Sequence, residues 1–211
     1  MASGGFSLTT TSRWSVVHAM QIPAQLLTLP NQLTIGRILA IPLICLFVAW
    51  GGPGWEWLRW IALLLYIAAA ITDWLDGFLA RRMKLNSALG KMLDPIADKL
   101  LVGALLITLA WTRDLNGWDL IPAIAIMLRE IFIPGLREYL GGRSIDVPVT
   151  MLAKWKTTVQ LVALGLIIAA PMLLGLGFIS HVVLWIAGAL TVWTGWEYLR
   201  STWPHLSGPE I

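Results

Sequence analysis

The sequence has few of the features from which soluble enzymes are built. Only 13% of its 211 residues are charged and 57% are hydrophobic, whereas about a quarter of the residues in a soluble domain are charged. The single cysteine, Cys45, excludes an internal disulfide and a cysteine-based metal site. The sequence also lacks a Gly-x-x-x-x-Gly-Lys phosphate loop and a His-Glu-x-x-His zinc motif. The shortage of charge therefore indicates an integral membrane protein.

Long apolar runs make up most of the chain. Each run is close to the roughly 20 residues that span the hydrocarbon core of a bilayer. The runs cover residues 33–50, 58–75, 89–111, 118–140, 149–174 and 178–199. Pro122 and Pro134 are expected to interrupt the fourth run, and Pro171 the fifth. Because no strand-period alternation occurs, we predict an all-α integral membrane protein, a six-transmembrane-helix bundle.

The ends of the chain are more polar than the predicted bundle, which covers residues 30–200. Residues 1–29 are expected to form an N-terminal extension, interfacial or disordered, and residues 201–211 a polar tail. Six spans place both termini on one side. Ten basic residues lie on that side: Arg13, Arg81, Arg82, Lys84, Lys91, Arg137, Arg143, Lys154, Lys156 and Arg200. Only Arg59 and Arg113 lie on the other, so both termini are expected in the cytoplasm.

Four carboxylates interrupt the apolar sequence near the predicted cytoplasmic side. They are Asp73, Asp76, Asp94 and Asp98. On helices, the first two share a face and the last two share another. Such acids repel one another unless a cation lies between them, and their oxygens suit magnesium or manganese. The alternative is a structural ion-pair network with the nearby basic residues, Arg81, Arg82 and Lys99, although carboxylates inside membrane helices are usually functional.

The spacing of these acids is a recognisable signature. Asp73-x-x-Asp76-Gly77-x-x-Ala80-Arg81 is followed, after eight residues, by Gly90-x-x-x-Asp94-x-x-x-Asp98. This pattern resembles the signature of the CDP-alcohol phosphatidyltransferase family, and the resemblance covers roughly residues 30 to 165. It implies two bound Mg²⁺ or Mn²⁺ ions held by all four acids, with Asp98 also acting as the general base.

The resemblance also implies a site for a CDP-linked lipid. Its residues are Asp73, Gly77, Ala80, Arg81 and Gly90. Small side chains let a nucleotide approach the helix backbone closely. The guanidinium of Arg81 is suited to pair with a pyrophosphate. Gly90 is expected to bring two helices together, so that the two acid pairs share the ions.

A second group of cations indicates an anionic acceptor. Arg129, Arg137 and Lys156 are the candidate phosphate ligands, and Lys154 is a further possibility. Their alternative roles are structural pairs with neighbouring glutamates and ordinary membrane anchors. Three polar residues at the start of the first run, Asn31, Thr34 and Arg37, are expected either to line the nucleotide or phosphate entrance or to act as helix caps and an anchor.

These features together predict an enzyme of the inner face of a membrane. The resemblance implies transfer of the phosphatidyl group from CDP-diacylglycerol to an alcohol, with release of CMP, by a homodimer. The cations favour glycerol 3-phosphate as the acceptor, and we expect a bacterial plasma membrane with the active site facing the cytoplasm. No nucleic-acid partner is expected. The alternatives are another acceptor, such as inositol phosphate or a phospholipid, and a divalent-cation transporter. Residues 61–70 and 101–109 are apolar, which argues against a permeation path.

Overall fold

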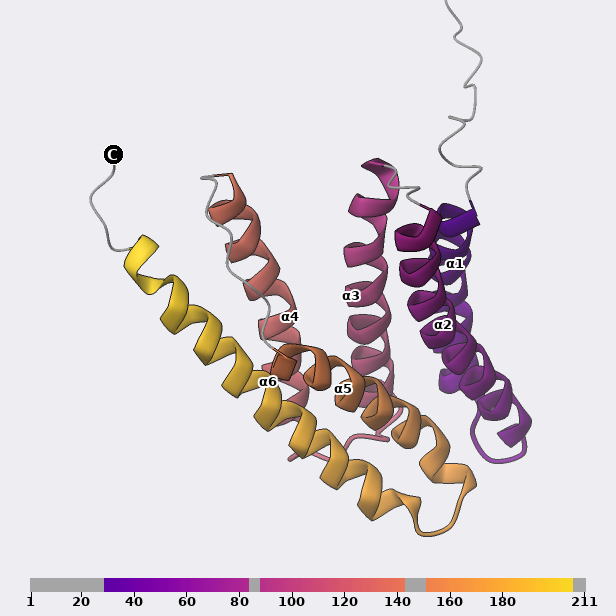
Figure 1. Cartoon of the computed structure of the whole chain (residues 1–211). Helices are drawn as coiled ribbons and strands as arrows, with labels where there is room; N and C mark the ends of the chain where they lie inside the picture. The colour runs from indigo at the N-terminus through magenta and orange to yellow at the C-terminus, as the bar shows by residue number, and fades with distance from the viewer. Residues whose placement is uncertain (1–28, 84–87, 143–150, 207–211) are drawn as a thin grey trace, which may run out of the picture.

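The computed structural model describes residues 29–83, 88–142 and 151–206, and these ranges are helical almost throughout. The helices are α1 (Leu29–Trp50), α2 (Glu56–Met83), α3 (Ala88–Trp111), α4 (Leu120–Gly141), α5 (Met151–Ala169) and α6 (Leu176–Leu206), with a short 3₁₀ helix, η2 (Ala170–Met172), before α6 (Figure 1). No strand occurs in the described ranges, which confirms the all-α prediction.

Three of the described helices are long and apolar enough to cross a membrane. The candidate segments are Asn31–Trp50, Lys154–Met172 and Leu176–Pro204. They support the prediction of an integral membrane protein. Helices α2, α3 and α4 contain more charged residues, because they carry the acids and cations singled out in the sequence.

The helices pack in two connected groups. Helix α1 packs against α2 and α3, whereas α6 packs against α4 and α5, and α5 also contacts α2 and α3. The core between them is aliphatic and includes Ile44, Leu105, Leu164 and Leu184, all without exposed surface. In Figure 1 the N-terminal ends of α1 and α3 and the C-terminal ends of α2 and α4 point the same way. The acidic sequence motif is therefore gathered at one end of the bundle.

The opposite end of α2 is held by a buried arginine. Arg59 donates from Nε to the carbonyl oxygen of Gly51 at 2.9 Å and from Nη2 to Asp114 at 2.7 Å. A Cβ atom at Gly51 would lie 2.4 Å from Arg59 Cγ, so only glycine fits there. Gly54 turns the chain with φ +86°. The gap predicted between the apolar runs 33–50 and 58–75 is thus confirmed, and Arg59 ties it to the loop between α3 and α4.

Helix α4 corrects one prediction. The sequence suggested that Pro122 and Pro134 interrupt this segment, yet α4 runs continuously from Leu120 to Gly141. Pro122 lies in the first turn, where its missing N–H has no intrahelical partner to lose. Pro134 is tolerated inside the helix, as prolines are in helices packed within a membrane bundle. The break predicted near Pro171 is confirmed, because α5 gives way to η2 there.

A tyrosine fixes α5 against α2. The Tyr66 hydroxyl donates to the carbonyl oxygen of Leu161 at 2.7 Å, and the ring is 3% exposed. A Cβ atom at Gly165 would lie 3.2 Å from the ring, so glycine allows this close approach. The contact sets the position of α5 relative to α2, which carries Asp73 about two turns further along.

Candidate active site

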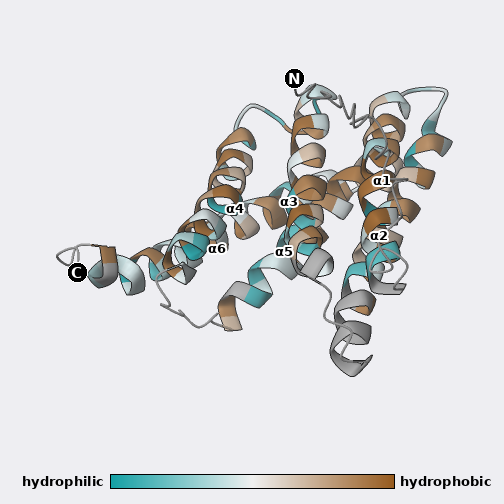
Figure 2. Cartoon of the chain, turned by 90° about the horizontal axis from the view of Figure 1, so that it is seen from above, coloured by the Kyte–Doolittle hydropathy of each residue, from teal (hydrophilic) through white to brown (hydrophobic). Residues whose placement is uncertain are grey.

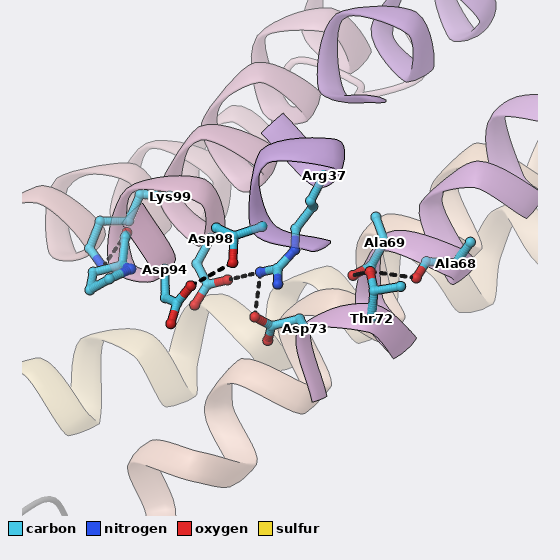
Figure 3. A network of polar contacts seen from close by, with 10 residues as sticks. Arg37, Ala68, Ala69, Thr72, Asp73, Asp94, Asp98 and Lys99 are labelled. Carbon is cyan, nitrogen blue, oxygen red and sulfur yellow. Dashed lines mark hydrogen bonds and ion pairs between the residues drawn. The ribbon is translucent and has the colours of Figure 1, made fainter. Parts of the chain in front are cut away.

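Arg37 of α1 joins the two acid-bearing helices. Its Nη1 atom contacts Oδ1 of Asp73 on α2 and Oδ1 of Asp98 on α3, the latter at 3.0 Å. Figure 3 shows the guanidinium between the two carboxylates, with Asp94 beside Asp98. The Arg37 side chain is only 1% exposed, whereas those of Asp73 and Asp98 are 37% and 51% exposed. The acids are therefore open to solvent on the side away from Arg37.

Helix α1, which carries Arg37, also binds Asp94. The Thr34 hydroxyl of α1 donates to Asp94 Oδ1 at 2.7 Å. Thr34 and Arg37 are three residues apart and share one face of α1. Thr34 lies inside α1 and does not cap it, and Arg37 is buried and is not an interfacial anchor. Asn31, in the first turn, is also buried. Thr34 and Arg37 thus contact the acids directly.

In the described part of the chain, the cation that pairs with the acids is Arg37. Lys99 directs Nζ to the carbonyl oxygen of Pro95 at 3.3 Å. The side chains of Arg81 and Arg82 lie outside the described residues. The cation observed between the acids is Arg37, whose sequence separations of 36 and 61 residues from its partners hide the contact.

The rest of the signature is described only in part. Asp76, Gly77, Ala80 and Arg81 belong to the last turns of α2, but their side-chain surroundings lie outside the described residues. Gly90 is buried in the first turn of α3. Among the described residues, no group of three or more His, Cys, Asp or Glu side chains is arranged to hold a metal ion.

A large cavity connects the acids with the predicted acceptor cations. Its volume is about 1510 Å³, and its lining includes Arg37, Asp73 and Asp98. Three of the predicted phosphate ligands line the same cavity: Arg129, Arg137 and Lys156. The fourth candidate, Lys154, is exposed and is not part of the lining. Helices α1 to α3 thus supply Asp73, Asp98 and the cations Arg37 and Lys99 to the same space that the three acceptor cations line.

The acceptor cations are partly neutralised. Glu130 Oε1 contacts Nζ of Lys156 and lies 3.3 Å from Nη1 of Arg129. Lys156 is 2% exposed. The structural pairing between Arg129 and Glu130 that the sequence left open is therefore present. Arg137 has a different neighbour, the ring of Tyr198, whose centroid lies 5.6 Å from Arg137 Cζ. Arg137 also lines the cavity, so its charge is presented to a ligand there.

Several residues that line the cavity were not assigned to the site from the sequence. They are Lys99, Gln160, Glu197, Tyr198, Arg200 and Ser201. The last four belong to the end of α6, which continues to Leu206, beyond the predicted end of the sixth run at residue 199. Figure 2 shows hydrophilic residues along this last part of α6. The polar residues at the end of the sixth apolar run were the available signal, but only residues 201–211 were set apart, as a tail.

Comparison of the sequence with known proteins identifies the family. The family model for CDP-alcohol phosphatidyltransferase matches residues 27–193. A CDP-diacylglycerol–glycerol-3-phosphate 3-phosphatidyltransferase from Cereibacter sphaeroides is 36% identical over 217 residues, which cover 85% of this chain and 97% of the relative. A protein of the same name from Rickettsia bellii is 43% identical over 176 residues, with 82% and 94% covered. A cardiolipin synthase (CMP-forming) from Oryza sativa subsp. japonica is 38% identical over 198 residues, with 86% and 59% covered. The chain therefore belongs to the CDP-alcohol phosphatidyltransferase family.

Proposed function

We propose that this protein transfers the phosphatidyl group of CDP-diacylglycerol to glycerol 3-phosphate, giving phosphatidylglycerophosphate and CMP. The observation that carries the proposal is the shared cavity, which has the acids of α2 and α3 on one wall and the cations of α4 and α5 on another. The names of the relatives from Cereibacter and Rickettsia support this acceptor. The second candidate is a phospholipid acceptor, because the rice relative is named a cardiolipin synthase.

The acidic residues fit divalent cations. Asp73 and Asp98 meet at a single nitrogen atom of Arg37, which shows that the helices direct both carboxylates to one positive charge. Their oxygens, with those of Asp94 and Asp76, are hard ligands that suit Mg²⁺ or Mn²⁺. Two bound ions would neutralise the pyrophosphate and align the leaving group.

The residues of the chain provide the remaining chemistry. Asp98 accepts the proton of the attacking hydroxyl group, whose oxygen forms a bond to the lipid phosphorus as the bond to CMP breaks. Arg137 and the Arg129–Lys156 pair hold the phosphate of the acceptor. Arg81 pairs with the pyrophosphate, while Gly77 and Ala80 leave room for the nucleotide. Displacement is direct, with no covalent enzyme intermediate.

The proposal includes a membrane arrangement with six spans. Large apolar side chains on the three more polar helices support it, since Leu64 on α2, Ile107 on α3 and Leu128 on α4 are 64%, 65% and 64% exposed. Such surfaces suit lipid contact. With six spans, the excess of basic residues favours both termini and the cavity on the cytoplasmic side. We also propose a bacterial plasma membrane, in line with the bacterial relatives, and a homodimer, which the resemblance to the family implies.

The acceptor is tested by CMP release. Purified protein in detergent, supplied with CDP-diacylglycerol and Mg²⁺, is expected to release CMP rapidly when glycerol 3-phosphate is added. Serine should give less than about a hundredth of that rate, because a site built for a phosphate leaves its cations unpaired without one. Inositol phosphate and phosphatidylglycerol keep a phosphate and should also be slower, the first because of its bulky ring and the second because its phosphodiester carries a single charge. Faster release with phosphatidylglycerol would favour the cardiolipin-forming reaction instead.

A charge variant locates the phosphate in the cavity. Arg137→Ala should raise the KM for glycerol 3-phosphate by about tenfold, since a charge-assisted hydrogen bond is lost. Arg113→Ala serves as the control, because Arg113 is exposed in the loop after α3, away from the acidic end. An unchanged KM in the Arg137 variant would place the phosphate elsewhere.

A further inference from the structure

We propose that Gln160 recognises the second hydroxyl group of the acceptor, the one that does not attack. The inference rests on the proposed function and adds to it a residue that determines acceptor specificity. Glycerol 3-phosphate carries two hydroxyl groups, of which one attacks the lipid phosphorus and the other remains free. A residue that binds the free group would orient the first.

The position of Gln160 is fixed by the fold. It lies on α5, four residues after Lys156, so the two side chains share one helix face. Both residues are 2% exposed and line the cavity that contains Asp98. The hydrogen bond from Tyr66 to Leu161, the next residue along, holds this part of α5 against α2.

The amide of Gln160 is available for a ligand. Within the described part of the chain, its buried Oε1 atom has no hydrogen-bond partner. A buried acceptor without a partner is costly, so a group that donates to it gains binding energy. The last torsion of a glutamine side chain is broad, and rotation about it turns either the oxygen or the amino group toward the cavity. The amide therefore matches a hydroxyl group, which both donates and accepts.

The charged groups next to Gln160 and the amide of Gln160 are suited to different parts of the acceptor. Lys156 contacts Glu130, which also pairs with Arg129, so charged groups surround the cavity next to Gln160. A phosphate is drawn to the cations, which leaves the neutral amide of Gln160 for the uncharged hydroxyl group. Gln160 is thus suited to bind the hydroxyl group on the carbon between the phosphate and the attacking hydroxyl group.

An acceptor analogue tests the inference directly. The analogue is 3-hydroxypropyl phosphate, which keeps the phosphate and the attacking hydroxyl group but lacks the second one. The natural protein should use glycerol 3-phosphate with a kcat/KM about 30-fold higher than the analogue. In Gln160→Leu this preference should fall to within about threefold, because only the glycerol 3-phosphate reaction loses a contact. Gln160→Met keeps the side-chain length and should show the same fall in preference, so it replaces the leucine variant if that variant does not fold.

The control variant is Thr158→Val on the same helix. Thr158 is exposed, bonds to the carbonyl oxygen of Lys154 at 3.4 Å and lies outside the cavity lining, so the preference should stay unchanged. Equal losses with both acceptors in Gln160→Leu would show a structural role and overturn the inference. Equal use of both acceptors by the natural protein would also overturn it. No CMP release with glycerol 3-phosphate would instead refute the proposed function, and this inference with it.

Discussion

Replacing Asp98 by Asn is expected to lower kcat by about 1000-fold, while CDP-diacylglycerol still binds. A positioned general base contributes about 100- to 10,000-fold to a proton-transfer step, and an amide cannot accept the proton. Asp98 is suited to this role because it lines the cavity and half of its side chain is exposed there, although Arg37 contacts one of its oxygens. Steady-state CMP release and CDP-diacylglycerol binding to the purified variant measure the two effects separately.

The control for Asp98→Asn is an acid at the other end of the bundle. Glu56→Gln changes an exposed carboxylate at the start of α2 to an amide and should leave kcat within about twofold, as surface substitutions usually do. Turnover by Asp98→Asn near that of the natural protein would remove Asp98 from the role of base. Loss of CDP-diacylglycerol binding would show that Asp98 acts mainly as a metal ligand.

Replacing Arg37 by Met is expected to make the protein depend on divalent metal for stability. Without the guanidinium, Asp73 and Asp98 face each other with no counter-charge between them. Breaking a fully buried ion pair costs about 3–5 kcal/mol, and the partial exposure of both acids reduces this to about 2 kcal/mol. In a protein of this size that corresponds to a fall of roughly 5 °C in Tm without metal.

Magnesium should then stabilise the Arg37 variant more than the natural protein. Mg²⁺ competes with Arg37 for the acids in the natural protein and has no competitor in the variant, so the gain in Tm from Mg²⁺ should be larger in the variant. Arg59→Met removes a comparably buried arginine that pairs with Asp114 at the opposite end, and its loss of stability should not respond to Mg²⁺. An equal response of both variants would show that Arg37 does not compete with metal.

The helices were predictable because their signals are local. The apolar runs and Pro171 mark most helix boundaries and breaks within a few residues of their observed positions, but α2 continues to Met83, past the predicted end of its run at residue 75. Pro134 was misread, because its effect depends on the surrounding helices more than on its own sequence neighbours. The end of α6 was also placed too early, since polar residues there continue the helix along the cavity.

The site was predictable only as a set of residue types. The spacing of the aspartates indicated which side chains share a helix face, and Asp73 and Asp98 do come together. The partners came from elsewhere in the chain: Thr34 and Arg37 from α1, and Glu130 from α4. Contacts between residues tens of positions apart depend on how the helices pack, and no local pattern encodes them. The acid that neutralises Lys156 was therefore not anticipated.

Manganese binding to the purified protein tests most directly whether the aspartates of α2 and α3 form one metal site. With CDP-diacylglycerol present, the free Mn²⁺ signal in electron paramagnetic resonance should fall as about two ions bind per chain. Asp73→Asn on α2 and Asp94→Asn on α3 should each weaken this binding at least tenfold. Binding by both variants that equals that of the natural protein, or the absence of binding in the natural protein, would contradict a site shared by the two helices.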